Sequence, residues 1–242
     1  MNINKKKLKV ICIIPARGGS KGIKNKNLQK ICNKSLISYP IRAAIRSKVC
    51  NKIIVSTDSK KIAREAKKYG AEVPFLRKKI LSGDRVTTEK TLQNALLEAE
   101  NYYNSKFDIC VFLTCTNIFR KALWIKKTVN ELKKNKNIDS AFSVYSFYKH
   151  VWHLKGGRFQ KVSHWMKSYT SRQVGQKLYR EDTGLASATR AKFWRKGKRI
   201  GSKVKFIINE DPFTGIDIHS KQDLYMAEMA MKYYKKHKLL DH

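Results

Sequence analysis

The stretch that decides the fold begins at Val10 and reads VICIIPARGGSKG, ending at Gly22. Residues 10–14 are continuously apolar and mostly β-branched, a pattern typical of a strand buried on both faces of a parallel sheet. The following residues include Gly18 and Gly19, and glycine allows backbone N–H groups to approach a ligand closely. A buried strand that leads directly into a cationic glycine loop therefore predicts an α/β protein with an anion-binding loop after its first strand.

Strand and helix patterns alternate along the rest of the chain. They cover the following residues: strands at 52–57, 108–113, 140–146 and 204–208, and helices at 36–48, 58–69, 87–103, 121–134 and 221–236. We expect Ser35 to be the N-cap of the helix at 36–48 and Gly70 to end the helix at 58–69. The alternation is typical of right-handed βαβ crossovers, and it predicts one α/β domain, residues 1–242, with an open, mostly parallel, doubly wound sheet.

Ligands of such sheets bind beyond the carboxyl ends of the strands. The loops at 15–27, 56–58 and 114–120 all follow predicted strands, so we expect them to face one crevice. Residues 147–180 interrupt the pattern, because they are aromatic, basic and rich in turns. We expect a small β-rich insertion there that reaches over the site or toward a partner subunit.

The charge balance is strongly basic, with 53 Lys and Arg against 18 Asp and Glu, a formal net charge of +35. Such an excess suggests a polyanionic partner: nucleic acid, an anionic membrane, or phosphorylated and acidic small substrates. A solvated lysine surface is the alternative explanation. The lysines are spread along the whole chain and form no basic tail, which argues against nucleic-acid binding as the main function.

The cysteines and the hydropathy indicate the redox state and the location of the protein. Five cysteines form no CxxC pair and several lie in apolar runs, so we expect reduced, buried thiols and neither disulfides nor zinc. No stretch reaches the roughly 18 apolar residues that a membrane span needs, and no apolar signal-peptide run follows the first lysines. These observations predict a cytoplasmic protein with no membrane contact.

The glycine loop carries the strongest chemical signal. Arg17, Lys21 and Lys26 are spaced along it, and guanidinium and ammonium groups both hold phosphate oxygens. A flexible basic surface loop is the alternative, but the position directly after a buried strand favours phosphate binding. The loop is not a P-loop, and it is not the GxGxxG loop of dinucleotide-binding proteins.

Residues 14–28, IPARGGSKGIKNKNL, resemble the signature loop of the CMP-acylneuraminate synthetase family, the cytidylyltransferases that activate sialic acids. Residues 54–58 and 69–77 resemble two further motifs of that family. The similarity covers about residues 9–120 and resumes over about residues 172–228. It implies a nucleotidyltransferase that couples CTP to an acidic α-keto sugar, uses Mg²⁺, releases pyrophosphate and forms a homodimer through the insertion at 147–180.

The resemblance also implies roles for individual residues. The predicted nucleotide-binding residues are Ala16, Arg17, Gly18, Ser20, Lys21, Lys26, Asn27, Arg77 and Thr88. The predicted catalytic residues are Arg17, Lys21, Lys26 and Asp217. In the expected reaction, the anomeric hydroxyl of the sugar attacks the α-phosphorus of CTP, and catalysis consists mostly of positioning and charge neutralisation.

The implied magnesium site departs from the family pattern. Strand alternation places Asp217 and His219 on the same side of the chain. Family members have two aspartates here, and both hold magnesium. Asp217 matches the first and is the expected ligand, whereas His219 replaces the second. His219 has three open roles: hydrogen bonding to a phosphate, contact with a metal-bound water, or a purely structural one.

The implied sugar site also departs from the pattern. Its predicted residues are Thr114, Gln173 and Arg180, and Arg180 would pair with the sugar carboxylate unless Glu181 or Asp182 engages it instead. Thr114 stands where the family has a glutamine, so it has shorter reach and fewer hydrogen bonds. An octulosonate, a legionaminate-like acid or another nucleotide therefore stays open as the substrate, with nucleic-acid binding as a distant alternative.

Overall fold

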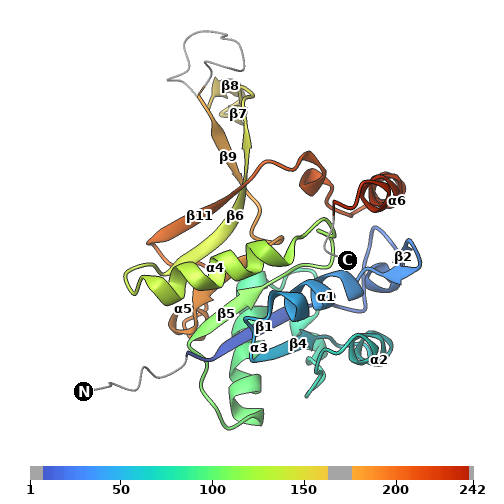
Figure 1. Ribbon diagram of the computed structural model, residues 1–242, viewed down its shortest axis with the longest axis vertical. Helices are drawn as coiled ribbons and strands as arrows, with labels where there is room; N and C mark the ends of the chain where they lie inside the picture. The colour runs from blue at the N-terminus through green and yellow to red at the C-terminus, as the bar shows by residue number, and fades with distance from the viewer. Residues whose placement is uncertain (1–7, 163–175, 240–242) are drawn as a thin grey trace.

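The computed structural model describes residues 8–162 and 176–239. A seven-stranded sheet forms its centre, with the order β11-β6-β10-β5-β1-β4 and with β9 paired to β6 (Figure 1). These strands are β1 (Val10–Pro15), β4 (Lys52–Ser56), β5 (Ile109–Phe112), β6 (Ser140–Phe147), β9 (Leu178–Glu181), β10 (Ser187–Arg190) and β11 (Val204–Asn209).

Most of the sheet is parallel. β1 pairs in parallel with β4 and β5, and β11 pairs in parallel with β6. β10 runs antiparallel between β5 and β6, and the sequence analysis did not predict it. Its residues, Ser-Ala-Thr-Arg, contain no apolar run that would have predicted a strand. Their small side chains are buried because β10 lies between two neighbouring strands. The predicted open, mostly parallel sheet is confirmed, with antiparallel β10 inside it and with β9 antiparallel to the end of β6.

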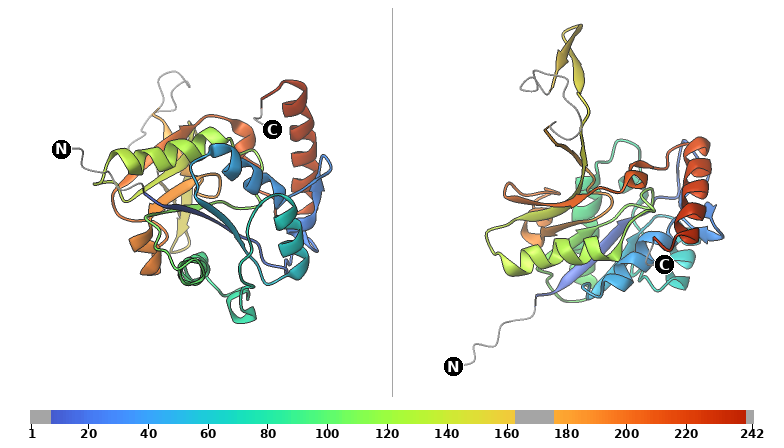
Figure 2. Two further views of the ribbon diagram at one scale, coloured as in Figure 1. Left: turned by 60° about the horizontal axis from the view of Figure 1, so that its bottom comes forward. Right: turned by 45° about the horizontal axis from the view of Figure 1, so that its top comes forward.

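Helices cover both faces of the sheet, as Figures 1 and 2 show. The α-helices are α1 (Ser38–Ser47), α2 (Lys60–Lys68), α3 (Thr88–Tyr102), α4 (Ala122–Lys134), α5 (Ala191–Arg195) and α6 (Lys221–Lys236). One apolar core joins α1, α2 and α4 to the sheet, and a second joins α3 and α5 to it. The predicted doubly wound arrangement is therefore confirmed.

The expected N-cap of the first helix is wrong. Ser35 lies in β3 (Lys34–Ser35), which pairs with β2 (Lys30–Ile31), and α1 begins only at Ser38, after Ile37. The backbone carbonyl of Ser35 instead accepts a hydrogen bond of 2.6 Å from the Ser38 hydroxyl. The other boundary prediction is confirmed, because α2 ends just before Gly70, which has a φ of 90°.

The insertion forms an arm that projects from the sheet (Figure 2). β6 and β9 make its base, and β7 (Trp152–Lys155) and β8 (Arg158–Lys161) form a hairpin beyond them. The hairpin turn uses Gly156 and Gly157, whose φ values of 58° and 72° suit glycine. The predicted β-rich insertion is confirmed for its described part, and residues 163–175 lie outside the described residues.

A third apolar core places α6 beside the β2–β3 hairpin. The Cys32 backbone N–H donates to the Glu228 carboxylate over 2.7 Å, which ties the hairpin to α6. Ser220 and Asp223 form a capping box at the start of α6. This packing brings residues 217–219, just before the helix, next to the glycine loop.

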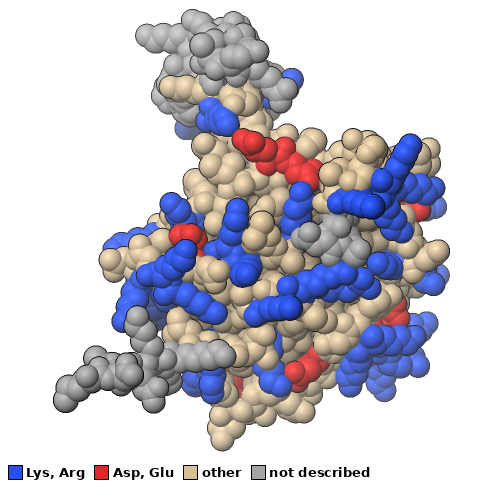
Figure 3. All heavy atoms as spheres, viewed as in Figure 1, with Lys and Arg blue, Asp and Glu red and all other residues tan. Residues whose placement is uncertain are grey.

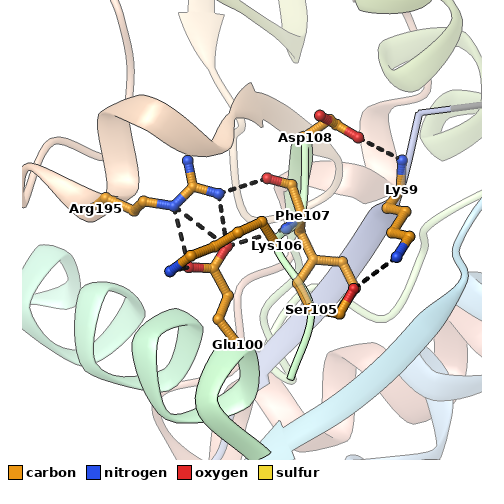
Figure 4. A network of polar contacts seen from close by, with 7 residues as sticks. All are labelled: Lys9, Glu100, Ser105, Lys106, Phe107, Asp108 and Arg195. Atoms are coloured by element: carbon orange, nitrogen blue, oxygen red, sulfur yellow. Dashed lines mark hydrogen bonds and ion pairs between the residues drawn. The ribbon is translucent and has the colours of Figure 1, made fainter. Parts of the chain in front are cut away.

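A polar network occupies the amino end of β5 (Figure 4). The buried Glu100 carboxylate accepts hydrogen bonds from Arg195 Nη2 at 2.6 Å, from the Phe107 backbone N–H at 3.0 Å and from Lys106 Nζ at 3.0 Å. Because Arg195 ends α5 and Glu100 lies in α3, the network fastens these two helices together. Asp108 accepts a hydrogen bond of 2.7 Å from the Lys9 backbone N–H beside it.

Lys and Arg side chains are scattered over the visible surface in Figure 3 and do not gather into one patch. All five cysteines are free. Cys12, Cys110 and Cys115 are buried, as expected, whereas Cys32 and Cys50 are only partly buried. Within residues 8–162 and 176–239, no helix is long and apolar enough to cross a membrane.

Candidate active site

A cleft of about 350 Å³ opens at the carboxyl ends of β1 and β5. Its walls come from the loops after those strands and from the segment that leads into α3. The lining residues are Pro15, Arg17, Lys26, Asn27, Arg77, Leu81, Ser82, Gly83, Asp84, Val86, Thr88, Thr91, Phe112, Thr114, Cys115 and Thr116. The loops at 15–27 and 114–120 therefore face one crevice, as expected, where parallel α/β sheets bind ligands. The third predicted loop, residues 56–58, does not line it.

The glycine loop is held at both ends. The Gly18 backbone N–H donates to the Asp58 carboxylate over 2.7 Å, which ties the loop to the end of β4. The buried Asn27 side chain donates to the Arg17 carbonyl over 2.9 Å. At Gly22, any added Cβ would collide with the His219 carbonyl oxygen, so only glycine permits this close approach. The loop thus has a defined shape before any ligand binds.

Asp84 pairs with two of the predicted phosphate-binding cations. Arg17 Nη1 lies 2.8 Å from Asp84 Oδ1, and Lys21 Nζ lies 2.8 Å from Asp84 Oδ2. The hydrogen bonds from Lys21 and from Arg17 lower the pKa of the Asp84 carboxyl below its ordinary value. One carboxylate therefore holds the Arg17 and Lys21 side chains side by side at the mouth of the cleft.

Lys26 connects the glycine loop to the segment before α6. Its Nζ donates to the Ile218 carbonyl over 3.1 Å. Burial lowers the pKa of Lys26, and the nearby Asp217 carboxylate acts in the opposite direction. A phosphate in the cleft would add negative charge beside this ammonium group and favour its charged form.

Arg77 and Thr88 line the cleft from the segment that leads into α3. Arg77 is only 6% exposed, and its Nε donates to the Ser82 hydroxyl over 3.1 Å. Burial lowers the pKa of Arg77, against the influence of Asp58. Thr88 is the first residue of α3, where free backbone N–H groups favour an anion or a polar ligand atom.

A buried arginine organises the loop after β5. Arg120 is 1% exposed and donates from Nη2 to the Thr114 and Gly184 carbonyls at 2.8 and 2.6 Å, and from Nε to the Leu185 carbonyl. Burial lowers the pKa of Arg120 to about 10. The Thr114 hydroxyl lies 2.6 Å from Asn117 Oδ1. Arg120 therefore holds Thr114 next to the loop that connects β9 and β10.

The predicted metal-binding residues lie next to each other. His219 Nε2 is 2.8 Å from Asp217 Oδ2, and both side chains are about half exposed, at 66% and 47%. The predicted placement on one side of the chain is confirmed. The described part of the chain contains no group of three or more His, Cys, Asp or Glu arranged to hold a metal. One carboxylate and one imidazole fit a divalent cation only if phosphate oxygens and water complete its shell.

Arg180 is engaged by Asp182, one of the two carboxylates expected to compete for it. It makes a two-pronged contact with Asp182, from Nε at 3.1 Å and from Nη2 at 3.0 Å, and it lies 5.2 Å from the Tyr145 ring centre. It does not line the cleft. Gln173, the other predicted sugar residue, lies outside the described residues.

The structure brings part of the predicted set together. Six predicted residues line the cleft: Arg17, Lys26, Asn27, Arg77, Thr88 and Thr114. Seven others lie outside its lining: Ala16, Gly18, Ser20, Lys21, Asp217, His219 and Arg180. Asp84 and Ser82 were missed, although the turn-forming Ser82-Gly83-Asp84 shortly after Arg77 offered a signal.

A family model described as cytidylyltransferase matches residues 11–238. The chain belongs to the cytidylyltransferase family. It is therefore an enzyme of the nucleotidyltransferase class, which confirms the predicted family.

Two relatives and one solved structure show how far the similarity extends. The chain is 44% identical over 104 residues to CMP-N,N'-diacetyllegionaminic acid synthase of Campylobacter jejuni, covering 43% of this chain and 44% of that protein. It is 29% identical over 233 residues to a Helicobacter pylori protein named pseudaminic acid cytidylyltransferase and UDP-2,4-diacetamido-2,4,6-trideoxy-beta-L-altropyranose hydrolase. That match covers 95% of this chain and 44% of the relative. CMP:2-keto-3-deoxy-manno-octonic acid synthetase complexed with CTP shares the fold, with a TM-score of 0.68 at 13% identity, over 93% of this chain and 99% of that one.

Proposed function

We propose that this chain transfers the CMP group of CTP to an acidic α-keto sugar of the nonulosonate class and releases pyrophosphate. The observation that carries the proposal is the cationic loop after β1, which brings Arg17 and Lys26 to one cleft with Arg77. Family membership supports the transfer of a cytidylyl group. The names of the two sequence relatives support a nonulosonate as the acceptor.

In the proposed reaction, the anomeric hydroxyl attacks the α-phosphorus and releases its proton to solvent. The bond between the α-phosphorus and the oxygen that bridges it to the β-phosphate breaks at the same time. Negative charge grows on the departing pyrophosphate. Arg17, Lys21 and Lys26 neutralise that charge, and the glycine loop, already held by Asp58 and Asn27, keeps them in place. No protein nucleophile takes part.

Asp217 is the proposed magnesium ligand, with His219 orienting its carboxylate. When bound there, magnesium would neutralise charge on the phosphate oxygens. Replacing Asp217 by Asn should raise the magnesium concentration needed for half-maximal turnover, which a titration with fixed CTP measures. Asp108→Asn, at the opposite end of the sheet, should leave the titration unchanged. A titration of Asp217→Asn that matches the wild type would contradict the assignment.

Pseudaminic acid is the proposed acceptor sugar. The relative named for that sugar matches 95% of this chain, including the segment around Arg180, whereas the relative named for the legionaminic acid product matches 43%. The Thr114 hydroxyl lies beside Asn117. The threonine side chain is shorter than a glutamine, so this wall of the cleft reaches less far toward the sugar. A sugar whose ring substituents differ from those of N-acetylneuraminate suits this wall.

A pyrophosphate-release assay tests the proposal. It would pair CTP, UTP and ATP in turn with pseudaminic, legionaminic, N-acetylneuraminic and octulosonic acids in the presence of magnesium. We expect CTP with pseudaminic acid to give the highest kcat/KM. A preference for legionaminic acid would correct the sugar, and a preference for octulosonic acid would overturn the nonulosonate class. RNA or DNA affinity that falls steeply with salt, without CTP turnover, would favour nucleic-acid binding.

A homodimer through the arm is also proposed. Trp152, Leu154 and Phe159 of the β7–β8 hairpin are 53%, 61% and 74% exposed, which is an unusual amount of apolar surface for such a small hairpin. Light scattering at micromolar concentration should report a dimer. A monomer at that concentration would contradict the prediction.

A further inference from the structure

Asp84 stands where the proposed function requires a phosphate. Its two carboxylate oxygens each lie 2.8 Å from a cation, one from Arg17 and one from Lys21. Among the described residues, neither cation makes an ion pair with any other carboxylate. A carboxylate that bridges two cations has the charge and the hydrogen-bond acceptors of a phosphate edge.

The exposure of this cluster makes the contacts exchangeable. The side chains of Arg17, Asp84 and Lys21 are 36%, 46% and 82% exposed. Ion pairs that are open to water are weak, because solvent screens them and holding the side chains costs entropy. A triphosphate carries several negative charges against the single charge of Asp84, so it competes well for the same two cations.

The local backbone gives Asp84 room to leave. Asp84 lies in the turn between the 3-10 helix η2 (Lys79–Leu81) and α3, and the Val86 N–H bonds the Gly83 carbonyl within that turn. The same segment lines the cleft and contacts Arg77 through Ser82. Asp84 can therefore separate from the two cations by a shift of one exposed turn, without disturbing a strand or a helix.

We propose that Asp84 is a built-in competitor for the triphosphate site of this enzyme. In the nucleotide-free protein its carboxylate keeps Arg17 and Lys21 together and occupies the place of a phosphate. Nucleotide binding displaces it, and its return to the cations promotes release of the pyrophosphate product. The inference rests on the proposed function for the identity of the nucleotide, but the competition itself concerns any polyphosphate.

The test measures binding to the full chain by titration calorimetry, with metal removed by a chelator. The probes are CTP, inorganic pyrophosphate and inorganic tripolyphosphate. Asp84→Asn should bind all three about three- to ten-fold more tightly, since losing weak exposed ion pairs changes affinity by factors of this size. Asp84→Glu, which keeps the charge, should stay within about two-fold of the wild type. Asp108→Asn removes the same charge far from the cleft and should change nothing.

A gain in affinity is a result that simple loss of structure does not produce. Unchanged or weaker binding of tripolyphosphate by Asp84→Asn would overturn the proposal, and so would equal tightening in Asp108→Asn. If tripolyphosphate and pyrophosphate bind more tightly to Asp84→Asn but the wild type turns over no nucleotide, the role of Asp84 as a competitor is supported and the proposed function fails. If CTP is turned over but Asp84→Asn binds like the wild type, the proposed function stands and the competitor fails.

Discussion

Two carboxylates at opposite ends of the sheet each bind two basic side chains, yet their surroundings differ. Glu100, near the amino end of β5, holds Arg195 and Lys106, and its side chain is 1% exposed (Figure 4). Asp84, at the cleft, holds Arg17 and Lys21, and its side chain is 46% exposed. The same kind of contact is thus buried at one end of the molecule and open to water at the other.

Burial decides what each cluster can do. Burial of Glu100 opposes its ionisation, but the hydrogen bonds from Arg195, the Phe107 N–H and Lys106 prevail and lower its pKa to about 2. Removing one partner from such a network leaves charge or polar atoms without solvent, so the network is permanent. The Asp84 cluster loses little when its partners exchange. The comparison predicts that changes near Asp84 affect activity and changes near Glu100 affect stability.

Arg17→Ala should show the largest effect, and it should be on activity alone. We expect kcat/KM to fall by about 10²- to 10³-fold, because one donor to the developing charge is lost. The free energy of unfolding should change by less than about 1 kcal/mol, since the Arg17–Asp84 pair is exposed. Pyrophosphate release and urea denaturation measure the two quantities. Arg64→Ala, an exposed arginine of α2, is the matched control. A fully active Arg17→Ala enzyme would remove the glycine loop from the mechanism.

Glu100→Gln should lower stability and leave activity unchanged, the reverse of Arg17→Ala. We expect the free energy of unfolding at neutral pH to fall by on the order of 3 kcal/mol, because Arg195 loses its buried anionic partner. The activity of the molecules that remain folded should match the wild type, since Glu100 lies at the end of the sheet away from the cleft. Chemical denaturation and pyrophosphate release on the same samples make the check. Reduced kcat/KM with unchanged stability would reverse the comparison.

The acid dependence of stability sharpens this prediction. The pKa of Glu100 is lowered from an ordinary 4.5 to about 2, so the unfolded chain binds a proton more readily than the folded one. The stabilisation is therefore complete above about pH 5 and is lost as the pH falls toward 2. The difference in unfolding free energy between the wild type and Glu100→Gln should shrink over that window. A difference that stays constant down to pH 3 would show that the Glu100 charge contributes nothing.

The sequence predicts contacts that are close along the chain better than those that are distant. The strand at Val10–Pro15 and its glycine loop have a local pattern, and Arg17, Lys26 and Asn27 follow from it. Arg120 has no such pattern, because its role depends on the carbonyl of Gly184, 64 residues later. The meeting of Asp84 with the glycine loop likewise exists only after the chain folds.

The same limit applies to β10 and to Arg180. The side chains of β10 have no apolar or alternating pattern, and the strand is buried because it lies between β5 and β6. The resemblance implies that Arg180 binds the sugar carboxylate, and the structure pairs it with Asp182, two residues away, so its role toward the sugar stays a prediction. A family motif indicates which residue types are present, but the pairings between their side chains exist only in the folded chain.

Lys106→Met should give the smallest effect, and it tests whether burial or charge number governs the Glu100 network. The Lys106 side chain is 76% exposed although its Nζ lies 3.0 Å from Glu100, so water replaces its contact readily. We expect a loss of less than about 1 kcal/mol in the free energy of unfolding, because Glu100 keeps Arg195 and the Phe107 N–H. Arg195→Met, measured by the same denaturation, should lower the free energy of unfolding several times more, since it leaves the buried carboxylate without its main cationic partner. Equal losses in the two variants would mean that the network responds to the number of cations around Glu100 and not to how deeply each contact is buried, and the contrast with the exchangeable Asp84 cluster would then lose its physical basis.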